Sequence, residues 1–239
     1  ANAGWADGFC TAISRNCRHR NGLRTYEMTL PDYAELHCLS NFSFLRGASH
    51  PEELVERAKA LGYTALAITD GCSFAGLVRA HVAAKAVGLK LICGAEIVLA
   101  DGMKLVLLAR DRAGYGNLSA IVSLGRRQAE KGSYRLTRGD LAPGIPDCLA
   151  LWVAPADATV DDACWLAEAF PDRAWMAFER HLAQADVVDG LDALLPRVDL
   201  GAVDVAGGGG VPEEQGQREP LVHVLRGGGV GVDDLLGAD

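Results

Sequence analysis

The central part of the chain alternates short apolar runs with amphipathic stretches, and this order predicts its secondary structure. The apolar runs are rich in Val, Ile, Leu and Ala and suit buried strands. Between them, apolar residues recur at the spacing of helices that bury one face. Strands are predicted at 34–39, 64–69, 89–93, 104–109, 149–153 and 175–178. Helices are predicted between 49 and 62 and at 74–87, 115–130, 161–170 and 186–195.

The bounds of the first helix are predicted from its capping residues. Ser49 is expected to be the N-cap, because Glu52 follows at the spacing of a capping box. Leu54 and Ala58 then begin an apolar stripe at helical spacing. Gly62 suits the end of the helix, since glycine readily adopts the left-handed conformation found there.

Strands that alternate with helices predict an α/β fold. Strands joined by a helix are expected to pair in parallel, whereas 89–93 and 104–109 are expected to form a hairpin. The pattern is compatible with an open doubly wound sheet and with a barrel, and it does not decide between them.

Composition and charge narrow the possible partners. Of the 239 residues, 49% are apolar and 23% charged, which suits a globular domain with a buried core. The net charge of −8 argues against binding of the phosphate backbone of a nucleic acid by this chain alone, because such binding requires clustered Lys and Arg. No apolar run approaches the roughly 20 residues of a transmembrane helix, so no membrane partner is expected. The seven cysteines are scattered without a C-x-x-C pair, which predicts reduced thiols in the cytoplasm.

The two ends of the chain differ from its middle. Residues 1–27 show no periodicity and precede Met28, so they are predicted to be a non-native or disordered extension of a domain at 28–199. Residues 200–239 contain 11 glycines and no aromatic residue, and are predicted to be an aberrant or disordered tail. A phosphate-binding loop is the alternative, but no G-x-x-x-x-G-K-[ST] motif occurs.

Several motifs in fixed order point to one family. HCL at 37–39, TDGC at 69–72 and GAE at 94–96 accompany the first three strands, and KLVLLA at 104–109 is followed by DRAGYGNL at 111–118. Together they resemble the PHP domain (polymerase and histidinol phosphatase type) at the N-terminus of bacterial C-family DNA polymerases. The resemblance is greatest to the error-prone, translesion branch. It implies a distorted (β/α)7 barrel, here incomplete at the C-terminus.

The resemblance also implies where a metal centre would stand. In metal-binding members, histidines and carboxylates at strand ends hold cations that activate water and neutralise phosphate. His37 and Glu96 retain two of these positions. The remaining positions hold residues that do not supply the expected ligand: Leu39, Arg46, Gly71, Lys104 and Ala206. We therefore predict no catalytic residue and a vestigial centre, in which His37 and Glu96 pair with Arg46 and Lys104.

A rescue of metal binding by the thiol of Cys38 or Cys72 is the alternative. Cys38 directly follows His37 in a strand, so its side chain is expected to face the other side. His181 stands near a position where some members carry a ligand, but a lone histidine at a strand end is more often a surface or packing residue. It is not counted as a site residue.

The resemblance implies part of an error-prone DNA polymerase, a DNA-directed nucleotidyltransferase of damage-tolerant replication and repair. The polymerase core of that family works with carboxylates and Mg²⁺, and this chain contains none of that core. The domain is expected to be a cytoplasmic scaffold that packs against the remainder of the polymerase chain, meets DNA only through that remainder and needs no cofactor. A stand-alone PHP phosphoesterase with Zn²⁺ or Mn²⁺ is the alternative, and a non-functional gene product is a third possibility.

Overall fold

The computed structural model describes residues 33–142, 144–155, 157–180 and 201–206. The strands are β1 (Ala34–Cys38), β2 (Ala65–Ile68), β3 (Lys90–Val98), β4 (Lys104–Ala109), β5 (Cys148–Val153), β6 (Ala174–Arg180) and β7 (Gly201–Ala206). The helices are α2 (Pro51–Ala60), α3 (Leu77–Val87), α4 (Arg112–Arg127), α5 (Arg138–Leu141) and α6 (Val160–Ala169). The predicted helix 186–195 and the predicted extension 1–27 lie outside the described residues. No helix in the described part combines the length and the apolar character of a membrane-spanning segment.

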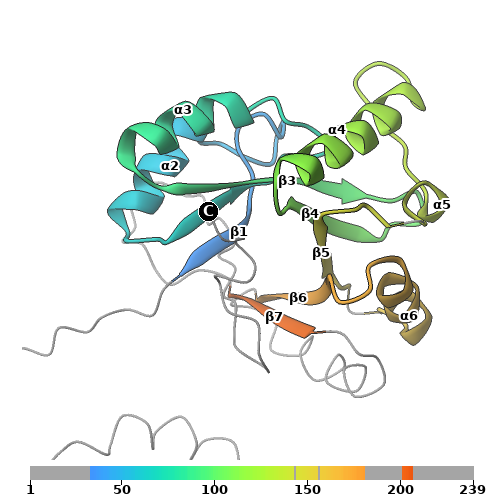
Figure 1. Cartoon of the computed structure of the whole chain (residues 1–239). Coiled ribbons are helices and arrows are strands. Elements are labelled where there is room, and N and C mark those ends of the chain that lie inside the picture. The colour runs from blue at the N-terminus through green and yellow to red at the C-terminus, as the bar shows by residue number, and fades with distance from the viewer. Residues whose placement is uncertain (1–32, 143, 156, 181–200, 207–239) are drawn as a thin grey trace, which may run out of the picture. The chain divides into compact units, whose positions relative to one another are not determined.

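The strands form one mixed sheet in which neighbours in sequence are also neighbours in space, from β1 to β7 (Figure 1). β1, β2 and β3 pair in parallel, β3–β4 and β4–β5 pair antiparallel, and β5, β6 and β7 are parallel again. The sheet curls, and among the described strands no pairing closes it from β7 back to β1. The predicted α/β class is confirmed, in the form of an incomplete distorted barrel.

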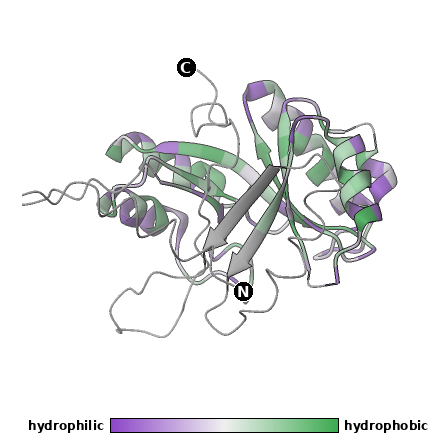
Figure 2. Cartoon of the chain, turned by 90° about the horizontal axis from the view of Figure 1, so that it is seen from below, coloured by the Kyte–Doolittle hydropathy of each residue, from purple (hydrophilic) through white to green (hydrophobic). Residues whose placement is uncertain are grey.

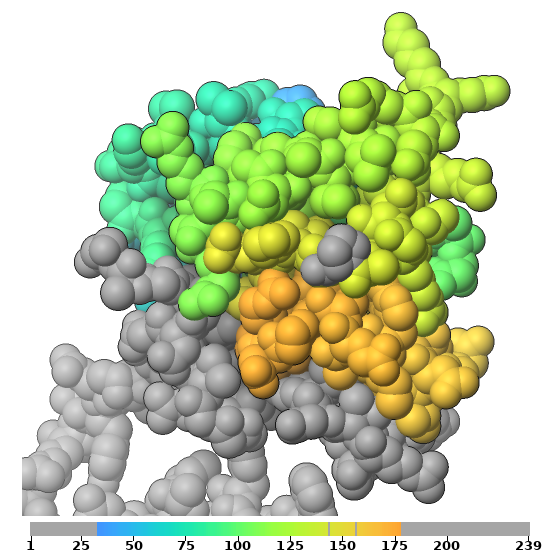
Figure 3. Space-filling model, turned by 45° about the vertical axis from the view of Figure 1, so that its right-hand side comes forward, coloured from blue at the N-terminus to red at the C-terminus, as the bar shows by residue number. Residues whose placement is uncertain are grey.

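Both faces of the curled sheet are covered, which explains the near-continuous apolar runs of its strands. In β5, Cys148, Ala150 and Trp152 pack in a cluster with α4, α5 and α6, whereas Leu149 and Leu151 pack inside the curl. Helices α2 and α3 cover the outer face of β1 and β2. Figure 2 shows polar residues mainly on helices and loops, and Figure 3 shows α4 packed closely against the chain from α5 to α6.

The predicted hairpin is confirmed, but one predicted parallel pairing is wrong. β3 continues past its predicted end and pairs antiparallel with β4. β4 and β5 also pair antiparallel, although α4 and α5 lie between them. The connection leaves β4 at Ala109 and enters β5 at Cys148, and these two residues are partners in the register. The chain therefore returns to the end of the sheet that it left, which a parallel pair would not allow.

Helix α2 begins later than the predicted capping box. Pro51 is the first helical residue and His50 the N-cap, because proline is preorganised for the first turn and lacks an N–H that would be unpaired there. Glu53, rather than Glu52, accepts a hydrogen bond from the His50 backbone N–H at 2.8 Å. Glu52 instead accepts from Arg79 of α3, whose Nε lies 3.0 Å from Oε1.

The glycines predicted to end α2 and α3 do so, whereas the beginning of α3 and both bounds of α4 differ from their predicted positions by about three residues. Gly62 (φ 79°) and Gly88 (φ 66°) follow α2 and α3 in the left-handed conformation. α3 begins at Leu77 rather than at 74. α4 begins at Arg112 rather than at 115, because the carboxylate of Asp111 accepts the N–H of Gly114 at 2.8 Å and caps the helix.

Strand β7 lies within the range 200–239 that the glycine content assigned to a tail. All six of its residues are partnered with β6 in parallel register. The overall glycine content hid this segment, because GAVDVA holds a single glycine and two valines, which favour a strand. Residues 207–239 lie outside the described part, so the tail and the domain limits remain predictions.

Candidate functional site

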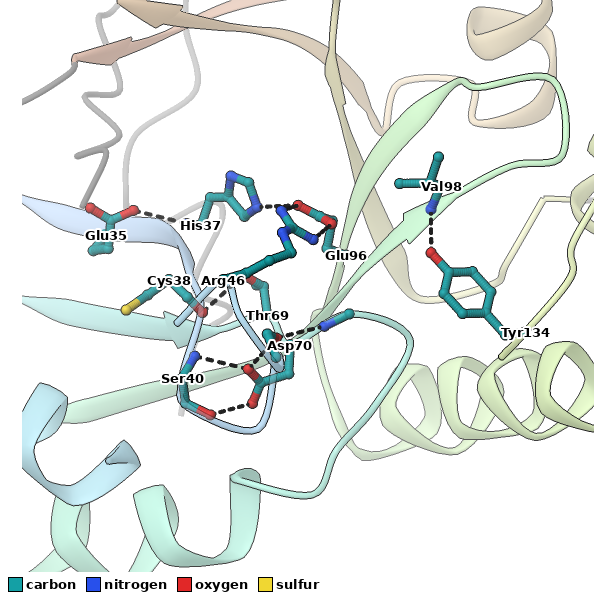
Figure 4. A network of polar contacts seen from close by, with 12 residues as sticks. Glu35, His37, Cys38, Ser40, Arg46, Thr69, Asp70, Glu96, Val98 and Tyr134 are labelled. Atoms are coloured by element: carbon teal, nitrogen blue, oxygen red, sulfur yellow. Dashed lines mark hydrogen bonds and ion pairs between the residues drawn. The ribbon is translucent and has the colours of Figure 1, made fainter. Parts of the chain in front are cut away.

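The carboxyl ends of β1, β2 and β3 meet at one edge of the sheet, because these strands are parallel. His37 stands near the end of β1, Asp70 and Gly71 follow β2, and Glu96 lies in β3. A bridge between Gly71 and Glu96 brings the loop after β2 against β3. The fold thus brings together the residues that the family resemblance predicts at the metal centre (Figure 4).

An irregularity in β1 places His37 next to Glu96. The register between β1 and β2 shifts between Glu35 and Cys38, as at a β-bulge. Glu35 supports this bend, since its Oε1 accepts the His37 N–H at 2.9 Å and its Oε2 accepts the Tyr33 hydroxyl at 2.9 Å. Cys38 packs in the cluster under α2 and α3, away from Glu96, as the strand alternation predicts (Figure 4).

Glu96 is the centre of the site, and its side chain is only 1% exposed. Nε2 of His37 lies 3.0 Å from Oε2, and Arg46 donates through Nη2 to the same oxygen at 2.8 Å and through Nη1 to Oε1. Burial alone would raise the pKa of Glu96, but the hydrogen bonds and charges of Arg46 and His37 lower the pKa to about 2. Glu96 is therefore ionised at neutral pH and held at both oxygens by a guanidinium.

The predicted pairing of the two retained residues is confirmed for Arg46 and wrong for Lys104. His37 and Arg46 both point at Glu96 (Figure 4). Lys104 makes no ion pair within the described part of the chain. The register explains why Lys104 is not a partner of Glu96. Lys104 is the first residue of β4 and lies opposite Val98 of β3, close to the hairpin turn, whereas Glu96 lies opposite Val106.

A second buried carboxylate, Asp70, organises the loop that carries Arg46, a role that the sequence did not reveal. Asp70 is 1% exposed, and it accepts hydrogen bonds from the Ser40 N–H at 2.8 Å and from the Ser40 and Ser43 hydroxyls at 2.7 Å. The Ser43 hydroxyl in turn accepts the Gly71 N–H at 3.0 Å. The loop after β1 is thereby tied to the end of β2. The two serines did not indicate this buried network in the sequence, because most serines in loops face solvent.

Gly71 leaves the space in which Arg46 lies. Apart from its chain neighbours, a Cβ at residue 71 would have one heavy atom within 4 Å, Nη1 of Arg46 at 4.0 Å. A longer side chain at this position would come against the guanidinium. The two departures from the metal-binding pattern, Arg46 and Gly71, therefore complement each other, and the guanidinium supplies the positive charge that Glu96 faces.

Arg126 of α4 holds the loop after β2 from another side, a contact that the sequence did not indicate. Its Nη2 and Nε donate to the carbonyl oxygens of Gly71 and Cys72, each at 3.1 Å. Its guanidinium carbon lies 5.4 Å from the ring centroid of Tyr134, whose hydroxyl accepts the Val98 N–H at 3.0 Å. A basic residue in the last turn of a helix is common, so its position alone carried no signal.

The residues present do not fit a metal centre. No group of three or more His, Cys, Asp or Glu side chains among the described residues is placed to hold a metal ion. The guanidinium of Arg46 occupies both oxygens of Glu96 and would repel a cation there. Cys38 lies on the opposite face, and burial raises the pKa of the Cys72 thiol, which keeps it protonated. His181 lies outside the described residues, and the absence of a catalytic residue remains a prediction.

Comparison with known proteins gives this site its context. The family model of the PHP domain matches residues 35–180. An error-prone DNA polymerase of Dechloromonas aromatica is 56% identical over 74% of this chain, and one of Azoarcus sp. is 52% identical over 66%. A third, of Aromatoleum aromaticum, is 59% identical over 62% of this chain. The chain spans 18%, 18% and 14% of the length of these three relatives.

Solved structures share the fold at low sequence identity. A protein of Bifidobacterium adolescentis assigned as a metal-dependent phosphoesterase aligns with a TM-score of 0.55 and 17% identity, over 81% of this chain and 93% of that protein. An amidohydrolase of Chromobacterium violaceum, with bound sulfate and no metal, aligns with a TM-score of 0.51 and 16% identity, over 71% and 84%. At such identities the likeness shows the fold alone. The motifs, the fold and the sequence relatives agree: this chain belongs to the PHP domain family and is homologous to the error-prone DNA polymerases.

Proposed function

We propose that this chain is the PHP domain of an error-prone DNA polymerase and serves as a structural domain against which the rest of the polymerase chain packs. The observation that carries the proposal is the contact between Arg46 and Glu96. In a metal-dependent PHP enzyme this position would bind a cation. Here the guanidinium of Arg46 lies against Glu96 instead. The site therefore acts as an internal ion pair rather than as a catalytic centre.

The burial of Glu96 supports a structural role. Glu96 is 1% exposed, so its charge needs partners inside the protein. Arg46 and His37 supply them, and removal of one partner of a buried pair leaves an uncompensated charge. Residues that were ligands in a metal enzyme would then stabilise the fold of a domain that has no metal.

The intact protein would supply the activity that this chain lacks. The sequence relatives named error-prone DNA polymerase are more than four times as long as this chain, since the matched segment covers only 14–18% of them. DNA synthesis, Mg²⁺ and contact with DNA would belong to the remainder, in the cytoplasm. The net charge of −8 is in keeping with a domain that does not itself hold the phosphate backbone.

A metal assay tests the site directly. The chain is incubated with p-nitrophenyl phosphate and Mn²⁺ or Zn²⁺, beside a Glu96→Gln control, and its melting temperature is recorded with each metal. We expect no hydrolysis above the control and no rise in the melting temperature. Metal-dependent hydrolysis that Glu96→Gln abolishes would overturn the proposal in favour of a phosphoesterase.

A deletion tests the structural role. The segment homologous to this chain is removed from the intact polymerase of Dechloromonas aromatica, and thermal unfolding and DNA synthesis are measured. We expect the shortened polymerase to unfold at a lower temperature and to lose activity faster on heating. A shortened enzyme as stable as the intact one would contradict the structural role.

A further inference from the structure

The loop that follows β1 presents a group of exposed apolar side chains. Phe42, Phe44 and Leu45 are 42%, 84% and 89% exposed. They belong to one short segment, beside Arg46 of the site. Single exposed apolar residues are common on protein surfaces, but a contiguous group of large ones is typical of a contact surface.

Internal contacts hold this loop in place. Asp70 accepts the hydroxyls of Ser40 and Ser43 at 2.7 Å, and Arg46 is anchored on the buried carboxylate of the site. The Gly47 N–H donates to the Ser43 carbonyl at 3.0 Å. A Cβ at Gly47 would lie 2.1 Å from the Ser40 carbonyl oxygen, so the two ends of the loop approach as closely as glycine allows. The apolar side chains are thus presented on a defined backbone.

Leu45 has a backbone conformation that its side chain does not favour. Its φ is 61°, in the left-handed region where Gly and Asn are preferred and a Cβ is strained. Leu45 is 89% exposed, so burial of its side chain within this domain does not offset the strain. Strained residues that bring no benefit to their own fold are found at binding surfaces.

We propose that Phe42, Phe44 and Leu45 form a docking contact for the polymerase chain that lies outside this domain in the intact protein. The inference rests on the function proposed above. In the relatives, the segment that matches this chain makes up only 14–18% of the length. Most of the intact protein therefore lies outside this domain and is available to cover the loop. The contact is apolar and preorganised, two properties that favour a protein partner.

The charge around the loop argues for a protein rather than a nucleic acid. Aromatic side chains also stack on single-stranded bases, but such sites combine them with a positively charged groove. The cation of this loop, Arg46, is engaged by Glu96, and the chain as a whole carries a net charge of −8. The loop therefore lacks the electrostatic part of a nucleic-acid site.

Footprinting in a chimera tests the contact. Residues 33–180 replace the homologous segment of the Dechloromonas aromatica polymerase, and oxidation of Phe44 by hydroxyl radicals is compared between the chimera and the 239-residue chain. We expect oxidation of Phe44 to be several-fold slower in the chimera. Equal rates in the two proteins would overturn the proposal, because the loop would then face solvent in both.

A pair of double variants extends the test to stability. Phe44→Ser with Leu45→Ser should lower the melting temperature of the chimera and leave that of the isolated chain unchanged. Val78→Ser with Val82→Ser is the matched control, since these valines of α3 are 73% and 65% exposed. It should have no such selective effect. If the chimera with the loop double variant melts at the same temperature as the chimera with the control double variant, the proposal is overturned.

The outcomes separate this inference from the proposed function. If deletion of the whole domain leaves the polymerase stable, the structural role fails, and the docking contact fails with it. If the deletion destabilises the polymerase but the loop variant does not, only the docking contact is wrong. Protection of Phe44 in the isolated chain by a single-stranded oligonucleotide, without protection in the chimera alone, would overturn the protein contact in favour of a nucleic-acid contact.

Discussion

Replacement of Arg46 by methionine removes the cation that Glu96 faces while keeping much of the side-chain volume. The pKa of Glu96 falls from an ordinary value of 4.5 to about 2, which is equivalent to roughly 3 kcal/mol of stability at neutral pH. His37 accounts for part of this, and solvent screens part of the Arg46 contribution, because that side chain is 44% exposed. We expect Arg46→Met to lower the free energy of unfolding by about 2 kcal/mol at pH 7.

The pH dependence tests whether charge is the cause. The pKa of Glu96 is lower in the folded chain than in the unfolded chain, so its contribution is complete above about pH 4.5 and is lost as the pH falls towards 2. In Arg46→Met, burial opposes ionisation with less compensation, and the pKa of Glu96 rises. The difference in stability between the wild-type chain and the variant should therefore be largest at pH 7 and should shrink by pH 3.

Urea denaturation at pH 7, 5 and 3 measures this difference, followed by the fluorescence of the tryptophans, among which Trp152 is 1% exposed. Arg79→Met is the control, because its partner Glu52 lies at the surface and this variant should change stability little at any of these pH values. A variant as stable as the wild-type chain at pH 7 would refute the reasoning. A loss of the same size at pH 7 and pH 3 would also refute it, since packing rather than charge would then explain the loss.

Three further predictions concern the loop after β1 and helix α4. Ser43→Ala removes a hydrogen bond to buried Asp70 and should lower the free energy of unfolding by about 1–2 kcal/mol in urea titrations; a neutral effect would contradict the network. Gly47→Ala places a Cβ 2.1 Å from the Ser40 carbonyl oxygen and should lower the melting temperature of the chain. Gly116→Ala, where a Cβ meets nothing within 4 Å, should raise the unfolding free energy by about 0.5–1 kcal/mol. Equal effects of these two alanines would contradict the loop geometry.

Local patterns predicted most elements of the fold because burial on both faces leaves long apolar runs along the strands. β5 is an example, since its six residues are all buried and were found almost to their limits. Helix bounds were less predictable than the existence of the helices. Ser49 was the expected N-cap of α2, but Pro51, whose fixed φ suits the first helical position, makes His50 the cap. β7 was missed because the composition of a long range concealed a short segment that becomes a strand only beside β6.

The periodicity of the sequence by itself determined the α/β class. Its motifs indicated the family, and with it the distorted barrel that the family implies and the absence of the expected ligands at Leu39 and Gly71. Only the tertiary structure decided which side chains complete the site. It chose Arg46 over Lys104 as the partner of Glu96 and revealed that Asp70 ties the loop that carries Arg46. The physical reason is that these contacts depend on strand register, on the bulge of β1 and on loop closure, which join residues far apart in the chain and leave no local pattern.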